Sequence, residues 1–384
     1  MASPAQGQTR VIPALTVTER YDTNVFFIPG GLPLEDYVTT VTPQVRVEHN
    51  GRLLSGDAQL TVVGEAYVKN PGLNYIAPTG SFNANLDELI GQYNKRIKLS
   101  VSDFLTVTPR PPAFFAPETG SVLPADFIRG IQAVRTNSVI NIGVINAGYI
   151  LSPTASLVGA YQHQYMHFGT SFAPAPGQGL FQTIFQTLSA GPQVKLTTRD
   201  TVTGSFLYSH MQFSQGDTFS STFETKGATA TWQRGLSPKL TLTLGGGATV
   251  VTGIDQILYL ANASLEWKER STTTTINYSR SIFPSFFIAA LPLVSQVVGV
   301  SVTHRFTDRL TANGNLNYAK NESTPDPVLV FDSYGASGNV TYAITRTVSA
   351  TASYRYNRFK SDFFGSGFDF DRHVISLSIR AEWP

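Results

Sequence analysis

The sequence predicts an all-β protein: a single transmembrane, antiparallel, up-and-down β-barrel of about 18 strands, within a range of 16–18. Three observations carry this prediction. Apolar and polar residues alternate with period two along the whole chain, short polar turns recur at regular intervals between longer links, and charge is low without high hydropathy. Charged residues make up 14% of the 384 residues, and the mean hydropathy is −0.03.

The alternation is clearest near the C-terminus. Ile375, Leu377 and Ile379 alternate with Ser376 and Ser378, and a period of two places the two sets on opposite sides of a strand. The same pattern recurs at residues 240–244, 300–306, 310–318 and 348–357. A helix would break these patterns within two turns. A lipid-facing side and a water-facing side explain them together.

Short polar links divide the alternating segments. They are His49–Arg52, Asn94–Arg96, Ser152–Thr154, Thr198–Asp200, Leu236–Lys239, Lys268–Ser271, Thr307–Arg309 and Thr345–Thr347. The intervening links are longer and rich in Pro, Gly and Phe; examples are Phe27–Glu35, Lys69–Gly80, Pro109–Val134, Gly169–Leu180, Ser285–Leu293, Asn321–Pro327 and Lys360–Asp369. Bacterial outer-membrane barrels have short periplasmic turns and long extracellular loops. A first strand at about 10–26 and a last at about 369–383 complete 18 strands, with both termini on the periplasmic side.

Composition excludes several other classes. No apolar run approaches the roughly 20 residues of a transmembrane helix; residues 286–294 come nearest and contain Pro292. The net charge is +2 without a basic stripe, which argues against a nucleic-acid binder. Zero cysteine removes disulfides, thiolate metal sites and thiol nucleophiles. We expect a flexible mature N-terminus over 1–9 and a barrel over 10–384, with a signal peptide encoded upstream in the natural gene.

Aromatic residues gather near the expected strand ends, where girdles at the two membrane interfaces would contact outer-membrane lipids. Ordinary β-propensity of Tyr and Phe is the other explanation. The residues are Tyr21, Tyr37, Tyr67, Tyr165, Tyr208, Trp232, Trp267, Tyr278, Tyr318, Tyr354 and Tyr356.

The segment Leu15–Phe26 contains a Tyr-Asp-x-Asn-hydrophobic element and is followed by Val41-Thr42-Pro43. A similar arrangement recurs where Leu99–Asp103 is followed by Val107-Thr108-Pro109. These segments resemble a family of β-barrel outer-membrane porins, some of which are associated with exosortase (PEP-CTERM) and exopolysaccharide gene systems. The resemblance extends over the full length with few fixed residues. It implies the fold and a place in the outer membrane, with the barrel-assembly machinery as a partner during biogenesis. The chain departs from the usual terminal aromatic, because Pro384 follows Trp383.

No catalytic pattern is present: the sequence has no Gly-x-Ser-x-Gly, His-Glu-x-x-His, phosphate loop or EF-hand spacing. His163 and His167 would lie about 13 Å apart on a strand, too far to chelate one ion. Asp362, Asp369 and Asp371 could hold calcium, but a solvated acidic loop is the favoured explanation. We therefore predict a non-enzyme without cofactor or metal.

The candidate functional residues are charges. Arg or Lys on the lipid face would cost about 2–4 kcal/mol at the midplane. Parity, meaning whether a residue falls on the polar or the apolar set of alternating positions in its strand, therefore assigns the following charges to the lumen: Arg46, Glu48, Glu65, Lys98, Glu266, Lys268, Arg305, Arg355, Arg380 and Glu382. The longest link, Pro109–Val134, is expected to fold into the lumen through its Phe residues or to cap the barrel from outside. In the first case Arg110, Glu118, Asp126 and Arg129 would set the selectivity of a pore constriction.

Three functions follow. The favoured one is a channel for passive diffusion of small hydrophilic solutes or ions. An exopolysaccharide export conduit is the second, suggested by the family's gene associations, and it should carry stacking aromatics in series. Parity places few aromatics inward, Tyr67 among them, which favours the first. A plugged structural or adhesive barrel is the third. The solute, the ion selectivity and a homo-oligomeric state stay open.

Overall fold

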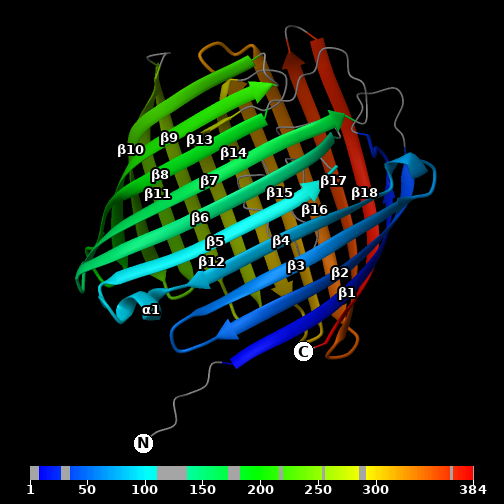
Figure 1. The fold of residues 1–384 in the computed structure, drawn as a ribbon, viewed down its shortest axis with the longest axis horizontal. Coiled ribbons are helices and arrows are strands. Elements are labelled where there is room, and N and C mark those ends of the chain that lie inside the picture. Colours follow the sequence, from blue (N-terminus) through cyan, green and yellow to red (C-terminus); the bar gives the residue numbers. More distant parts are fainter. Residues whose placement is uncertain are drawn as a thin grey trace, which may run out of the picture.

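The computed structural model describes residues 8–26, 35–109, 136–171, 182–215, 219–252, 256–284, 291–363 and 366–383. These residues form a closed antiparallel barrel of 18 tilted strands (Figure 1). Each strand pairs with the strands next to it in sequence, and β1 also pairs with β18. The predicted fold class and strand number are therefore confirmed.

The strands have the following bounds: β1 Gln8–Asp22, β2 Asp36–Asn50, β3 Ser55–Tyr67, β4 Tyr75–Asn85, β5 Ile97–Thr108, β6 Thr136–Ser152, β7 Ala155–Ser171, β8 Gln182–Lys195, β9 Asp200–Gln215, β10 Phe219–Ser237, β11 Leu240–Val251, β12 Gln256–Lys268, β13 Thr272–Pro284, β14 Pro292–Arg305, β15 Leu310–Ser323, β16 Leu329–Ala343, β17 Val348–Phe363 and β18 Ser366–Glu382. Two short helices accompany them: η1 Pro71–Leu73 and α1 Asp87–Gly91. Among the described residues, no helix is long and apolar enough to cross a membrane.

The seam between β1 and β18 brings the two ends of the chain together. Ala14 pairs with Glu382 and Asp22 with Val374. The start of β1 and the end of β18 consequently lie at one rim of the barrel, the rim that also carries α1 (Figure 1). We call this rim the short-turn end, because the eight short links are there, and the opposite rim the long-link end.

Several expected boundaries differ from the structure. β1 begins at Gln8 and ends at Asp22 rather than spanning 10–26, and β18 begins at Ser366. Most of the expected loop Lys360–Asp369 is strand. The expected loop Lys69–Gly80 was also too long, because β4 starts at Tyr75 and pairs with β3 through Pro78. Pro and Gly there suggested a loop, but at Pro78 β4 pairs with β3 alone, because its pairing with β5 begins at Thr79, and an unpaired strand edge tolerates proline. The turn expected at Asn94–Arg96 is a longer link containing α1.

The two faces of the sheet differ in chemistry. Phe185 of β8 and Phe283 of β13 have ring centroids 5.9 Å apart although four strands lie between β8 and β13, so their face is the inside of the barrel. The opposite face carries the exposed apolar side chains, such as Leu60, Ile76 and Ile375. The alternation in the sequence thus becomes an apolar outer wall and a largely polar inner wall.

Tyrosines mark the outer wall toward the long-link end. The rings of Tyr21 and Tyr37 lie 5.1 Å apart, and Tyr21 donates a hydrogen bond to Glu35. Lys69 Nζ lies 2.5 Å from Glu35 Oε1. Hydrogen bonds from Lys69 and then Tyr21 hold the pKa of Glu35 below its usual range. This polar cap on aromatic rings is the arrangement expected at a membrane interface.

Candidate functional site: the inner wall

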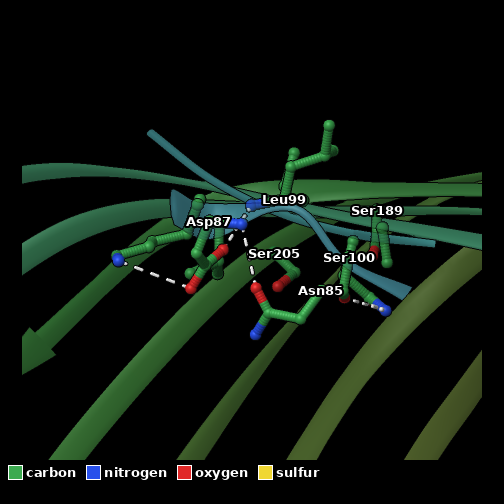
Figure 2. Close-up of a pocket in the computed structure, with 13 residues that line it drawn as sticks. Asn85, Asp87, Leu99, Ser100, Ser189 and Ser205 are labelled. Carbon is green, nitrogen blue, oxygen red and sulfur yellow. Dashed lines mark hydrogen bonds and ion pairs between the residues drawn. The ribbon is translucent and has the colours of Figure 1, made fainter. Parts of the chain in front are cut away.

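The inner wall near the short-turn end is polar and open. Two cavities of about 450 and 560 Å³ adjoin there and share Asn85, Ser100 and Asn146. We call this region the polar vestibule; its side chains include Arg46, Glu48, Asp57, Asn83, Asn85, Lys98, Ser100, Ser102, Asn146, Ser189 and Ser205. Figure 2 shows Asn85, Ser100, Ser189 and Ser205 around the first cavity. Amides and hydroxyls predominate, so the surface can both donate and accept hydrogen bonds.

Helix α1 closes one side of the polar vestibule through Asp87. The Asp87 backbone N–H donates to Asn85 Oδ1 at 2.9 Å, and the Asp87 carboxylate accepts from the backbone N–H of Leu99 at 2.8 Å. Lys98 Nζ lies 3.4 Å from the same carboxylate (Figure 2). One acidic side chain therefore connects the helix to the start of β5.

The strand register places all the charges assigned to the lumen on the inner face. Arg46 pairs across the sheet with Ile12 and Gln59, and Glu65 with Thr40. Glu266 pairs with Thr241, Arg305 with Thr311, Arg355 with Ser337 and Arg380 with Thr16. Paired residues share a face, and these partners belong to the inward set. What these charges do to a permeating ion remains a prediction.

Most of these charges are paired in the structure. Arg46 and Glu48 form an ion pair within β2, Lys268 Nζ lies 2.7 Å from Glu266 Oε1, and Arg380 Nη2 lies 2.7 Å from Glu382 Oε2. Each pair joins residues two apart on one strand. Their side chains are 21–63% exposed, so neighbouring opposite charges largely offset each other near the short-turn mouth.

Toward the long-link end the inner wall is apolar and buried. One cluster, the apolar cluster, comprises Phe104, Ile140, Ile142, Met166, Phe185, Met211, Phe213, Phe283, Leu293, Leu329, Phe331, Phe359 and Phe370. It draws on both sides of the barrel, since β8 and β13 meet through Phe185 and Phe283. The expectation of few inward aromatics was wrong. Several of these phenylalanines lie in or beside segments that the sequence suggested were loops, where parity was not applied.

A buried ionic network interrupts the apolar wall at the seam. Arg372 of β18 binds the Asp22 carboxylate through two nitrogens, with Nε 2.7 Å from Oδ1. Arg20 binds Glu65 through two bonds of 2.9 and 3.2 Å, and Tyr67 donates to Glu65 at 2.6 Å. We call Arg20, Asp22, Glu65, Tyr67 and Arg372 the seam network; all are at most 5% exposed.

Sequence reasoning identified Glu65 and Tyr67 but missed Arg20, Asp22 and Arg372. Parity within β1 and β18 would have placed these three on the inner face. Their pairing could not be read from the sequence, because Asp22 and Arg372 lie 350 positions apart. The proposed constriction residues Arg110, Glu118, Asp126 and Arg129 lie outside the described residues. No group of three or more metal-ligating side chains occurs in the described part of the chain.

Comparison with known proteins gives one family match. Residues 257–383 match the family model described as "Putative beta-barrel porin 2". The matched segment contains β13–β18 and nearly all of β12. An association of this chain with exosortase or exopolysaccharide systems is suggested only by the sequence resemblance of Leu15–Phe26 and Leu99–Asp103 described above. No curated protein matches the chain in sequence.

Several solved structures are similar in outline. The Pseudomonas aeruginosa protein OccK2 (OpdF) has 10% identity, covers 97% of this chain and 98% of its own, and gives a TM-score of 0.47; it was also solved in complex with glucuronate. OpdO of the same organism has 10% identity, 98% and 97% coverage and a TM-score of 0.48. The siderophore receptor PirA, also from P. aeruginosa, has 10% identity, 100% and 81% coverage and a TM-score of 0.44. Similarity at this level is no guide to what this chain binds.

Proposed function

We propose that the protein is a porin-like channel of the bacterial outer membrane that lets small hydrophilic solutes diffuse through its lumen. The observation that carries the proposal is the closed 18-strand barrel with an apolar outer wall and an inner wall that is polar and open toward the short-turn end. A barrel of this strand number is too wide for its own wall side chains to fill throughout. The match of residues 257–383 to a porin family model supports the same function. The short-turn end is then periplasmic and the long-link end extracellular.

The apolar cluster defines where passage is hardest. Side chains from β8 and β13 touch across the lumen, and Phe213, Phe331 and Phe359 are at most 1% exposed. Apolar constrictions oppose ion entry by excluding water. A plugged barrel with a structural role is therefore the second candidate, and the cluster is the observation that favours it.

Single-channel recording in a planar bilayer separates the two candidates. A channel gives discrete, stable conductance steps from purified, heat-modifiable protein, and the reversal potential in a salt gradient gives its ion preference. The fold is checked by far-UV circular dichroism and by the heat-dependent gel shift. An absence of conductance from folded protein would contradict the channel and favour the plugged barrel.

A further inference from the structure

A regular row of asparagine and glycine crosses the inner wall from β13 to β17. In register, Asn277 pairs with Gly299, Gly299 with Asn317, Asn317 with Gly335, and Gly335 with Asn357. Asparagine thus occurs on every second strand, at a spacing of roughly 10 Å, which is two strand separations. We call these five residues the asparagine–glycine row.

The glycines fix how the amides lie. A Cβ at Gly335 would be 2.1 Å from Asn317 Oδ1, and one at Gly299 would be 2.6 Å from Asn277 Oδ1. Each amide therefore lies flat across the neighbouring strand in the space that a side chain would fill. Gly245 and Asn262 repeat the arrangement on β11 and β12, again at 2.1 Å. The wall stays flat while presenting amide groups along its surface.

The amides of Asn277 and Asn317 are available to a ligand, whereas Asn357, the third asparagine of the row, is buried and has interactions within the protein. Within the described residues, the side chains of Asn277 and Asn317 have no protein hydrogen-bond partner. Asn277 is exposed and Asn317 half-buried. The polar row four residues nearer the short-turn end on β15 differs, because Asn313 accepts from Thr303 at 2.7 Å and donates to Asn339 at 3.0 Å. That row satisfies its amides within the protein, whereas the described structure gives the side-chain amides of Asn277 and Asn317 no protein partner.

The position of the row places it on the path of a solute. On β13, β14, β16 and β17 the row lies on the short-turn side of Phe283, Leu293, Phe331 and Phe359 of the apolar cluster. A solute moving between the short-turn mouth and the cluster must pass this level of the barrel.

The chemistry of the row selects for uncharged ligands. An amide offers two donors and an acceptor, which matches hydroxyl groups that both donate and accept. No member carries a charge, and the cation next in register, Arg372, is bonded to Asp22. We propose that the asparagine–glycine row is a binding track for uncharged polyhydroxylated solutes, that is, saccharides. This inference rests on the proposed channel function and names its substrate class.

The test uses the full protein in planar bilayers with maltohexaose as probe. Maltohexaose should reduce the ion current saturably, whereas polyethylene glycol of similar size, which lacks hydroxyls along its chain, should reduce it only in proportion to its concentration. In the double variant Asn277→Val/Asn317→Val the half-saturating maltohexaose concentration should rise roughly tenfold, because two hydrogen bonds are lost, with the sugar-free conductance kept.

A matched glycine pair checks that the flat amide is the cause. Gly335→Ala displaces the Asn317 amide and should weaken maltohexaose block several-fold. Gly338→Ala lies on the outer face of the same strand, where the nearest atom is 3.8 Å away, and should leave block unchanged. Equal block in wild type and the double variant, or no saturable block of an open wild-type channel, would overturn the track while leaving the channel intact.

If the wild type does not conduct, the channel proposal fails but the track is still testable. Isothermal titration of maltohexaose into folded detergent-solubilised protein should then show binding that the double variant weakens. Absence of binding in wild type would overturn the track by this second measurement.

Discussion

The two ends of the inner wall differ in side-chain polarity and burial, although the same alternating strands form both. At the long-link end, inward side chains are large and apolar and bury one another, with the seam network as a desolvated ionic insertion. At the short-turn end, inward side chains are small amides and hydroxyls with half-exposed ion pairs. The polar, open inner wall at the short-turn end is therefore the part of the described lumen best suited to contact water.

This contrast implies a division of energetic roles. Substitutions at the long-link end should lower stability most, because truncating a buried apolar side chain leaves a cavity and removing one partner of a buried ion pair leaves an uncompensated charge. Exposed groups at the short-turn end contribute little stability, because water screens them. The same exposure gives them direct contact with solutes. Stability and permeation should consequently respond to substitutions at opposite ends of the barrel.

The largest effect is expected at the seam network. Asp22→Asn leaves the Arg372 guanidinium buried without its carboxylate, and removing one partner of a buried ion pair costs about 3–5 kcal/mol. Urea unfolding in lipid vesicles, followed by tryptophan fluorescence, measures the change. Glu382→Gln is the matched control, since the Arg380–Glu382 pair is 31% and 42% exposed and should cost under about 1 kcal/mol. Similar losses in both variants would show that burial does not separate the two ends.

The second effect concerns the apolar cluster. Phe185→Ala removes the ring that contacts Phe283 across the lumen, so it should lower unfolding free energy by about 3 kcal/mol and raise single-channel conductance. Phe206→Ala, on the outer face of β9 and 54% exposed, provides the control and should leave conductance unchanged. If Phe185→Ala conducts like wild type, the narrowest point lies elsewhere than at this contact.

The features predicted from sequence are those that depend on local pattern. Period-two alternation and the short turns gave the strand number, and parity placed Arg46, Glu266 and Arg380 on the inner face, because each property is decided within one strand and its turn. Boundaries were less reliable where Pro and Gly occur within strands, as at Pro78.

The features missed depend on pairing between strands. The Asp22–Arg372 bond requires the barrel to close. The asparagine–glycine row exists only once five strands are in register, and its members look unrelated in the sequence. Phe283 and Phe370 join one buried cluster only when the barrel closes and brings distant strands together.

The smallest stability effect and the clearest permeation effect are expected at the short-turn mouth. The pairs Arg46–Glu48, Lys268–Glu266 and Arg380–Glu382 offset charge locally. The triple variant Glu48→Gln/Glu266→Gln/Glu382→Gln leaves three unpaired cations facing the lumen, so the reversal potential in a salt gradient should shift toward anion preference by a few fold. The complementary triple Arg46→Gln/Lys268→Gln/Arg380→Gln should shift it the opposite way. The loss of any one of these ion pairs should lower the free energy of unfolding by under about 1 kcal/mol. Shifts of the same sign in both triple variants would mean that ions pass at a distance from these pairs. The polar vestibule would then line the lumen without contacting permeating ions.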